Sequence, residues 1–442
     1  MNKKIIWTAT LFSSACTAPS ESSEITFDIE LISRSQGQGQ IPSAIDPLND
    51  PSGLGLDMRT RLEELPTHGR LSETPWSGSY WPENKGGIAY RWRTEESFDY
   101  VFATEEQVAA ATPSQIANLS PAEKYDLLAG STDWPLSARV LAGTSPNEAS
   151  WTGYCHGWAP ASLETDEPTP VTMVNDDGIE IRFGSSDIKA LLTYFYAEVV
   201  SADYVGQDYS VERLGMGTAC GSGEIWDPSC YDTNPAAFHI ALTNLIGLRQ
   251  MGFVMDVDPT YEKWNQPVYG YQSRALETLQ PREGTNPEVD SIKIIQTQVS
   301  WGMEIEPQWE PLGSDAQVTK TQDYFYSLEL SSDGEILGGQ WVIQLRDGDF
   351  LTLDDAWSGL SVVDEDGDGA PDFDDDQISE ILWQYYRFPD FIWVQNGLSL
   401  PESFESVASQ YSLLATTAST RQELYDYMGL LPELIEAMDR SQ

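Results

Sequence analysis

The sequence predicts an α+β protein, with helices concentrated in the first half of the chain and antiparallel strands in the second. Residues 120–200 contain a helix-capping signal and apolar residues at helical spacing. Residues 252–343 contain alternating strand patterns and a hairpin turn. The chain has 442 residues, 40% of them hydrophobic, so it is long and apolar enough to bury a large core.

Two helices are predicted in the first half. Ser120, Pro121 and Glu123 form a capping box with proline at the first helical position, and Gly130 is expected to end this helix. Residues 186–200 are expected to form the second helix, because their apolar side chains recur every three or four positions.

The second half of the chain is dominated by strand patterns. Residues 238–246 fit either a helix or a strand. Residues 252–258 predict a strand that places Asp256 and Asp258 on the same face. Further strands are expected at residues 291–297, 298–305 and 324–330, the last of which enters a turn at 333–334 and returns through 336–343 as a hairpin. An amphipathic helix is expected over 422–438, within a C-terminal extension spanning 401–442.

The N-terminus has the pattern of a bacterial export signal over residues 1–15. The small residues before Cys16 resemble a lipoprotein cleavage site, in which Cys16 would carry the lipid. The resemblance points to an outer-membrane lipoprotein of the bacterial cell envelope, held to the membrane only through that lipid; plain secretion is the alternative. Residues 16–66 are rich in Ser, Gln, Gly, Pro and acids, which predicts an acidic, polar tether.

The chain is strongly acidic. It has 24 Lys and Arg residues against 70 Asp and Glu residues, a formal net charge of −46. This charge disfavours nucleic acid and anionic lipid as partners and attracts cationic substrates, including surfaces that carry lysine.

Four cysteines are available in the chain. If Cys16 carries a lipid, Cys220 and Cys230 bracket a short loop that suits a local disulfide in an oxidising compartment. Cys155 is then left as an odd thiol, which in an exported protein is either a buried spectator or a nucleophile. Pairing of Cys155 with Cys220 or Cys230 stays open as an alternative.

Cys155 lies in a stretch of small and aromatic residues, 151–161, that predicts a loop entering a helix. Backbone N–H groups at a helix start favour the thiolate, so we expect a lowered thiol pKa and a reactive nucleophile. Such a nucleophile needs a base, and the chain has three histidines. His68 falls in the loosely attached arm expected before ordered structure begins near Trp76. His156 directly follows the cysteine, and neighbouring side chains at a helix start diverge, so it is a poor base. His239 is left as the base by elimination.

An acidic residue is expected to orient this base. Asp256 follows His239 on the next predicted strand, and Asp258 is the substitute on the same face. The alternative for both elements is structural, a satisfied core histidine and a solvated strand aspartate.

Residues 264–271 are similar to the peptide signature of the elicitor-type transglutaminases, a calcium-responsive family first known from cell-wall glycoproteins that plants sense as foreign. The alternative for this segment is a structural surface loop. Further motifs of this resemblance follow in the same order over about residues 70–395, at 75–82, 86–92, the Cys155 stretch, 238–239, 252–258, 338–341 and 389–393.

The resemblance implies a papain-like or transglutaminase-like core over residues 67–400 and protein-glutamine γ-glutamyl transfer. Cys155 would attack a glutamine side-chain amide, and ammonia would leave with a proton from His239. The amine of a lysine or polyamine would then resolve the thioester, and Asp256 would orient the imidazole. The implied partners are proteins that supply glutamine donors and amine acceptors.

The resemblance also implies an oxyanion site. The backbone N–H of Cys155 would be one donor. Papain-type enzymes use a glutamine six positions before the cysteine, but here that residue is Ala149. The indole of Trp76 or Trp81 is the candidate second donor.

Residues 364–375 match a calcium-binding loop that the family resemblance does not explain. Gly369 permits the turn of such a loop. We expect a structural Ca²⁺ in this insertion, remote from Cys155, and a disordered charge run is the alternative. The predicted ligands are Asp364, Asp366, Asp368, Asp372 and Asp375.

Two other functions compete with acyl transfer. The same triad would serve a cysteine peptidase or deamidase if water rather than an amine reached the thioester. A protein from another class, a surface binding protein, would carry Cys155 as a packed thiol without catalysis.

Overall fold

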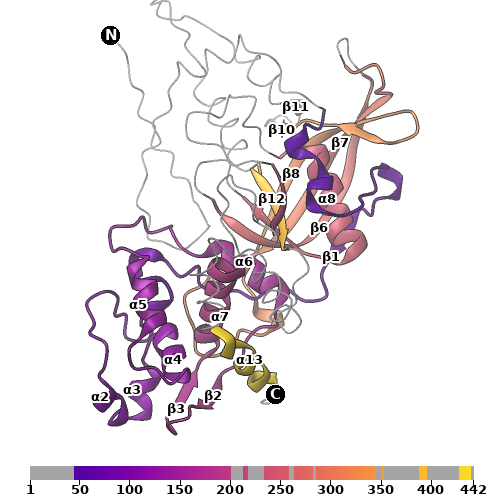
Figure 1. The fold of residues 1–442 in the computed structure, drawn as a ribbon. Helices are drawn as coiled ribbons and strands as arrows, with labels where there is room; N and C mark the ends of the chain where they lie inside the picture. The colour runs from indigo at the N-terminus through magenta and orange to yellow at the C-terminus, as the bar shows by residue number, and fades with distance from the viewer. Residues whose placement is uncertain are drawn as a thin grey trace, which may run out of the picture.

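The computed structural model describes residues 44–200, 213–217, 233–257, 263–281, 285–344, 350–352, 388–395 and 428–439. A helical part at one end packs against a curved antiparallel sheet at the other (Figure 1). Most helices precede the long strands in the chain, which confirms the predicted α+β class. Within these residues, no helix is both long and apolar enough to cross a membrane.

The helical part is built from short capped helices and one small hairpin. The predicted capping box is confirmed, because Ser120 and Glu123 bond reciprocally at the start of α4. The second predicted helix, α7, continues as the π-helix η6 (Phe195–Val200). The elements of this part are α2 (Glu105–Ala109), α3 (Pro113–Ala117), α4 (Pro121–Leu128), α5 (Pro135–Ala142), α6 (Cys155–Glu164), β2 (Val171–Val174), β3 (Glu180–Phe183) and α7 (Ser185–Tyr194).

In the described residues, the main sheet has eight strands, and each pairs antiparallel with its neighbours. Along the sheet the order is β4 (Arg213–Gly217), β12 (Phe391–Gln395), β5 (Phe253–Asp256), β6 (Asn265–Leu279), β7 (Ser291–Gly302), β8 (Thr319–Leu330) and β9 (Ile336–Gly338), with β1 (His68–Arg70) pairing β6 off this path. A separate pair is formed by β10 (Val342–Gln344) and β11 (Phe350–Thr352).

The segment at 238–246 is helical, which resolves the ambiguity in its pattern. Asn234 caps α8 (Pro235–Leu242), with its side chain accepting from the N–H groups of Ala236 and Ala237. Pro235 occupies the first turn, where its missing N–H has no consequence. The helix continues as the π-helix η7 (Thr243–Leu248).

The two faces of the sheet carry two separate hydrophobic clusters. Val254 and Trp393 pack with α6 and α7 in the first cluster. Phe253, Met255 and Ile392, which alternate with them along β5 and β12, pack with α8 in the second. Because successive strand residues point to opposite faces, α6 and α8 cover opposite sides of the sheet.

The predicted tether over residues 16–66 is wrong for its second part. Residues 44–66 form the short helices η1 (Pro47–Asn49), η2 (Pro51–Leu54) and η3 (Leu62–Glu64), and Leu54 is fully buried. Asp46 and Asp50 cap the first two of these, so proline and acid there encode turns and not a free chain. His68, expected in an unstructured arm, belongs to β1.

Two predictions about strands also need correction. Residues 264–271, for which a surface loop was the alternative, largely belong to β6, whose residues from Asn265 to Tyr271 are buried. Residues 291–302 form one long strand, β7, in place of the two strands predicted at 291–297 and 298–305. The hairpin at 333–334 is confirmed by the pairing of β8 with β9, but the return strand ends at Gly338.

The predicted C-terminal helix over 422–438 is described only from residue 428 onward. α13 (Leu431–Asp439) follows η9 (Met428–Leu430), and Leu431 and Leu434 are buried in the first cluster. One side of the segment 428–439 therefore packs against the helical part, where α13 lies beside β2 (Figure 1).

Several predictions fall on residues outside the described ones. The export signal with Cys16, the cysteine pair Cys220 and Cys230, and Asp258 belong to this group. So does the whole loop with Asp364, Asp366, Asp368, Asp372 and Asp375. The lipid, the disulfide and the calcium site stay predictions.

Candidate functional site

Cys155 is the first residue of α6, as the sequence predicts. Two glycines set its surroundings. A side chain at Gly153 would meet the carbonyl oxygen of Tyr80 at 2.6 Å, so the 79–82 segment can pass close to the helix start. A side chain at Gly157 would collide with the carbonyl oxygen of Thr193, so only glycine lets α7 pack against α6. The two glycines therefore let the 79–82 segment and α7 come close to the start of α6, where Cys155 lies.

The thiol of Cys155 is free and half-buried, and it faces the segment that enters β6. Its Sγ donates to the carbonyl oxygen of Lys263 at 3.5 Å. The side-chain amide of Asn265 donates to the same sulfur at 3.7 Å. The indole of Trp393 donates to Asn265 Oδ1 at 2.9 Å and so fixes the amide with its N–H groups toward the thiol. Asn265 thus supplies an oriented amide beside the sulfur.

Two carboxylates act on the thiol through the electrostatic field. Asp256 pairs with Asn265 in the sheet register and is fully buried, and its Oδ1 accepts from the backbone N–H of Trp264 at 2.8 Å. Glu304 follows the end of β7, and its Oε1 accepts from the Gln266 side-chain amide at 2.7 Å. Glu304 Oε2 is buried and accepts no hydrogen bond from any residue that the structure describes.

The expected low pKa of the thiol is not found. Burial raises the pKa of Cys155 to about 11, and the charges of Glu304 and Asp256 add to the rise, while hydrogen bonds from Asn265 oppose it. The resting group is therefore a protonated thiol. Burial also raises the pKa of Glu304, to about 7, despite the Gln266 hydrogen bond and the attraction of Lys320.

His239, the expected base, does not lie beside Cys155 in this structure. It belongs to α8, which covers the opposite face of the sheet from α6. Its side chain is buried, and its neighbours Phe238 and Ile240 belong to the second hydrophobic cluster. Its Nδ1 pairs with the hydroxyl of Tyr326 at 2.7 Å, and burial lowers the pKa of His239 to about 4. The sequence could not reveal this, because the face that α8 covers depends on tertiary packing.

The two tryptophans considered for the oxyanion site differ in their contacts. The Trp76 indole N–H already donates to Thr165 Oγ1 at 3.1 Å. The Trp81 indole N–H is buried and has no acceptor among the described residues. Asn265 was missed as a donor because its segment was recognised only as a family signature. Glu304 was missed as well, because nothing in the sequence sets it apart from the other residues of the strand predicted at 298–305.

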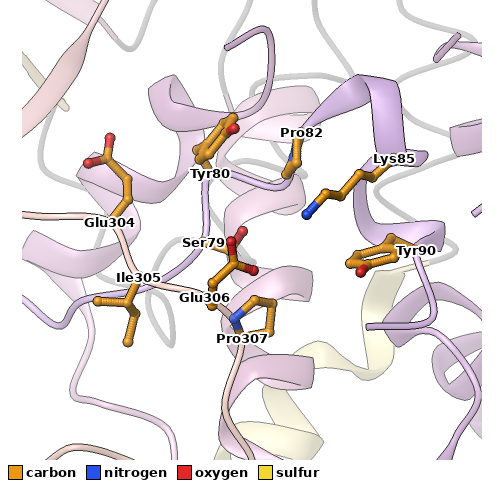
Figure 2. Close-up of a pocket in the computed structure, with 9 residues that line it drawn as sticks. All are labelled: Ser79, Tyr80, Pro82, Lys85, Tyr90, Glu304, Ile305, Glu306 and Pro307. Carbon is orange, nitrogen blue, oxygen red and sulfur yellow. The ribbon is translucent and has the colours of Figure 1, made fainter. Parts of the chain in front are cut away.

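A pocket lies beside the residues around the Cys155 thiol, and Glu304 forms part of its wall (Figure 2). It contains about 440 Å³ of empty space, including space open to solvent. Its lining residues are Ser79, Tyr80, Pro82, Lys85, Tyr90, Glu304, Ile305, Glu306 and Pro307.

The residues that the structure describes contain no group of three or more His, Cys, Asp or Glu side chains placed to hold a metal ion. The candidate site consists of the Cys155 thiol, the Asn265 amide and the carboxylates of Asp256 and Glu304, beside the pocket.

Comparison with known proteins gives one family. The family model described as "Transglutaminase elicitor" matches residues 52–119 and 143–369, a range that includes Cys155, Asn265 and Glu304. Among solved structures, the GP42 transglutaminase from Phytophthora sojae is similar, with 21% sequence identity and a TM-score of 0.49 over 78% of this chain and 88% of that chain. No curated protein sequence matches the chain.

Proposed function

The chain belongs to the transglutaminase elicitor family, and from that premise we propose that it is a protein-glutamine γ-glutamyltransferase with Cys155 as its nucleophile. The observation that supports this most is the free thiol at the start of α6, with the Asn265 amide beside it. A cysteine at the start of a helix that packs on an antiparallel sheet also supports a papain-like core. The substrates would be protein glutamines and the amines of lysines or polyamines.

Acyl transfer requires a group that moves the thiol proton. The thiol is protonated at rest, so sulfur must lose its proton as it attacks the glutamine carboxamide carbon. Glu304 suits this role, because its carboxyl pKa of about 7 leaves it able to accept and return a proton near neutrality. In our proposal the carbon–sulfur bond forms, the carbon–nitrogen bond breaks, and the thiol proton passes through Glu304 to the departing ammonia.

The developing negative charge on the amide oxygen needs donors. The backbone N–H of Cys155 at the helix start is one candidate, because the first N–H groups of a helix have no partner within it. The Asn265 side-chain amide, held by Trp393, is the second. Asp256 would hold the segment before Asn265 through its hydrogen bond to Trp264.

Replacing Glu304 with glutamine tests the proton step. We expect the turnover number of Glu304→Gln to fall by about 10²- to 10⁴-fold, the usual contribution of a general base. In the unchanged protein, turnover should rise as pH increases through about 7, where Glu304 becomes a carboxylate, and this rise should be absent from the variant. A variant that keeps both turnover and the rise would exclude Glu304 as the proton carrier.

A surface binding protein without catalysis is the second candidate, because the thiol pKa is raised and His239 pairs with Tyr326 on the opposite face of the sheet. The full chain, in buffer with calcium chloride, should be incubated with a glutamine dipeptide and hydroxylamine. Acyl transfer predicts hydroxamate and ammonia in equal amounts. Ammonia without hydroxamate would indicate a deamidase, and neither product would favour the binding protein.

A further inference from the structure

The pocket beside Glu304 lies between two segments of the chain, residues 79–90 and 304–307. Tyr80 lines it, and the carbonyl oxygen of Tyr80 accepts from the N–H of Tyr154, the residue before Cys155, at 2.6 Å. Glu304 also lines it and is one of the charges that act on the thiol. The pocket therefore opens beside the helix start that carries the nucleophile.

The walls of the pocket combine carboxylates with aromatic rings. Glu304 and Glu306 come from the segment after β7, and Tyr80 and Tyr90 come from the segments opposite (Figure 2). Tyr90 is buried, and burial together with the charges of Glu95 and Glu306 raises its pKa. Carboxylates and tyrosine rings are groups that bind an organic ammonium.

An ammonium group already lies at this pocket. Lys85 points into the space that Glu306 faces (Figure 2), and its Nζ lies 5.3 Å from the centre of the Tyr90 ring. It forms no salt bridge of 4.0 Å or less with the described carboxylates. A primary amine therefore fits the pocket, and a second one would compete with Lys85 for the same carboxylates.

We propose that this pocket binds the acceptor amine as its ammonium ion, with Glu306 as the anchoring carboxylate and Lys85 as a resident competitor. This inference rests on the proposed acyl transfer and names the acceptor site of that reaction. Glu306 is exposed and Glu304 is half-buried, so the cation would be attracted at the rim and lose its proton near the thiol.

The second half of the reaction balances with these groups. The bound ammonium releases one proton to solvent, and its nitrogen attacks the thioester carbon. The carbon–nitrogen bond forms and the carbon–sulfur bond breaks. The remaining surplus proton of the amine passes through Glu304 to the sulfur of Cys155, which restores the thiol.

The test compares a cationic acceptor with an uncharged one. The full chain is assayed at pH 8 with one glutamine dipeptide and either cadaverine, which is cationic, or hydroxylamine, which is uncharged. The measured quantity is the ratio of kcat/KM for cadaverine to kcat/KM for hydroxylamine. We expect Glu306→Gln to lower this ratio about two- to fivefold, the range of an exposed ion pair. Lys85→Met should raise it. Glu310→Gln, which removes an exposed charge outside the pocket lining, is the matched control and should leave it unchanged.

The outcomes separate this inference from the proposed function. A ratio that stays the same in Glu306→Gln, or that falls in Lys85→Met, would overturn the acceptor site while hydroxamate formation still supports acyl transfer. Absence of hydroxamate from every protein would overturn the proposed function, and the acceptor site with it.

Discussion

Cys155→Ala is expected to abolish both hydroxamate formation and ammonia release. Without sulfur no thioester can form, and the remaining Asn265 amide and backbone donors cannot replace a nucleophile. Loss of a catalytic nucleophile lowers turnover by about 10⁴-fold or more. The measurement is the hydroxamate assay, with thermal unfolding to show that the variant is folded. Hydroxamate formation by folded Cys155→Ala would contradict the proposal.

His239→Asn is the informative control for this result. The asparagine amide can reproduce the Nδ1 contact with Tyr326, so the fold should be kept. Because His239 lies on the face of the sheet opposite α6, we expect turnover to persist in the folded variant. If turnover were lost without loss of stability, the imidazole would have to reach the thiol in another conformation, as the family resemblance implies.

Asp187→Ala is expected to have the largest effect on stability. Asp187 and Lys124 are both fully buried, and Lys124 Nζ lies 2.6 Å from Asp187 Oδ2. Asp187 also accepts from the Trp92 indole at 2.8 Å and from the Gly184 N–H at 2.7 Å. Removing the carboxylate leaves the Lys124 ammonium, the Trp92 indole and the Gly184 N–H without their acceptor, and Lys124 is both charged and fully buried. Such a loss costs about 3–5 kcal/mol in free energy of unfolding.

Urea unfolding followed by tryptophan fluorescence checks this prediction. Lys124→Met should cost less than Asp187→Ala, because the carboxylate keeps the donors from Trp92 and Gly184. The double variant should be more stable than Asp187→Ala alone, since no uncompensated ammonium remains. Asp333→Ala, which breaks the exposed contact with Arg61, is the control and should move the midpoint little. Equal midpoints for Asp187→Ala and Asp333→Ala would contradict the argument.

Local signals in the sequence were sufficient for much of the fold. The capping box at Ser120 and the helix start at Cys155 each depend on neighbours along the chain, and each is present in the structure. The strand predicted at 252–258 is present as β5, Phe253–Asp256. Residues 44–66 were missed because their turns are rich in the same polar residues and prolines as a flexible arm.

The candidate site was only partly predictable, because its chemistry depends on packing between distant segments. Cys155 and Asp256 were named from sequence, and in the structure the charge of Asp256 contributes to the raised pKa of the Cys155 thiol. The raised thiol pKa follows from burial, which the Cys155 motif does not encode. Glu304, just after β7, and Trp393, in β12, lie about 150 and 240 residues beyond Cys155 along the chain, a separation over which no spacing rule applies.

The burial of β6 limits access of other proteins to the family signature at residues 264–271. The first seven residues of this strand, Asn265 to Tyr271, are covered on both sides of the sheet. An antibody raised against this peptide, or a cell-surface receptor that binds it, would have access to almost none of it in the folded protein. Only chains that proteases have cut, or that heat has opened, would display the epitope, so detection of the peptide would report damage to the protein rather than its presence.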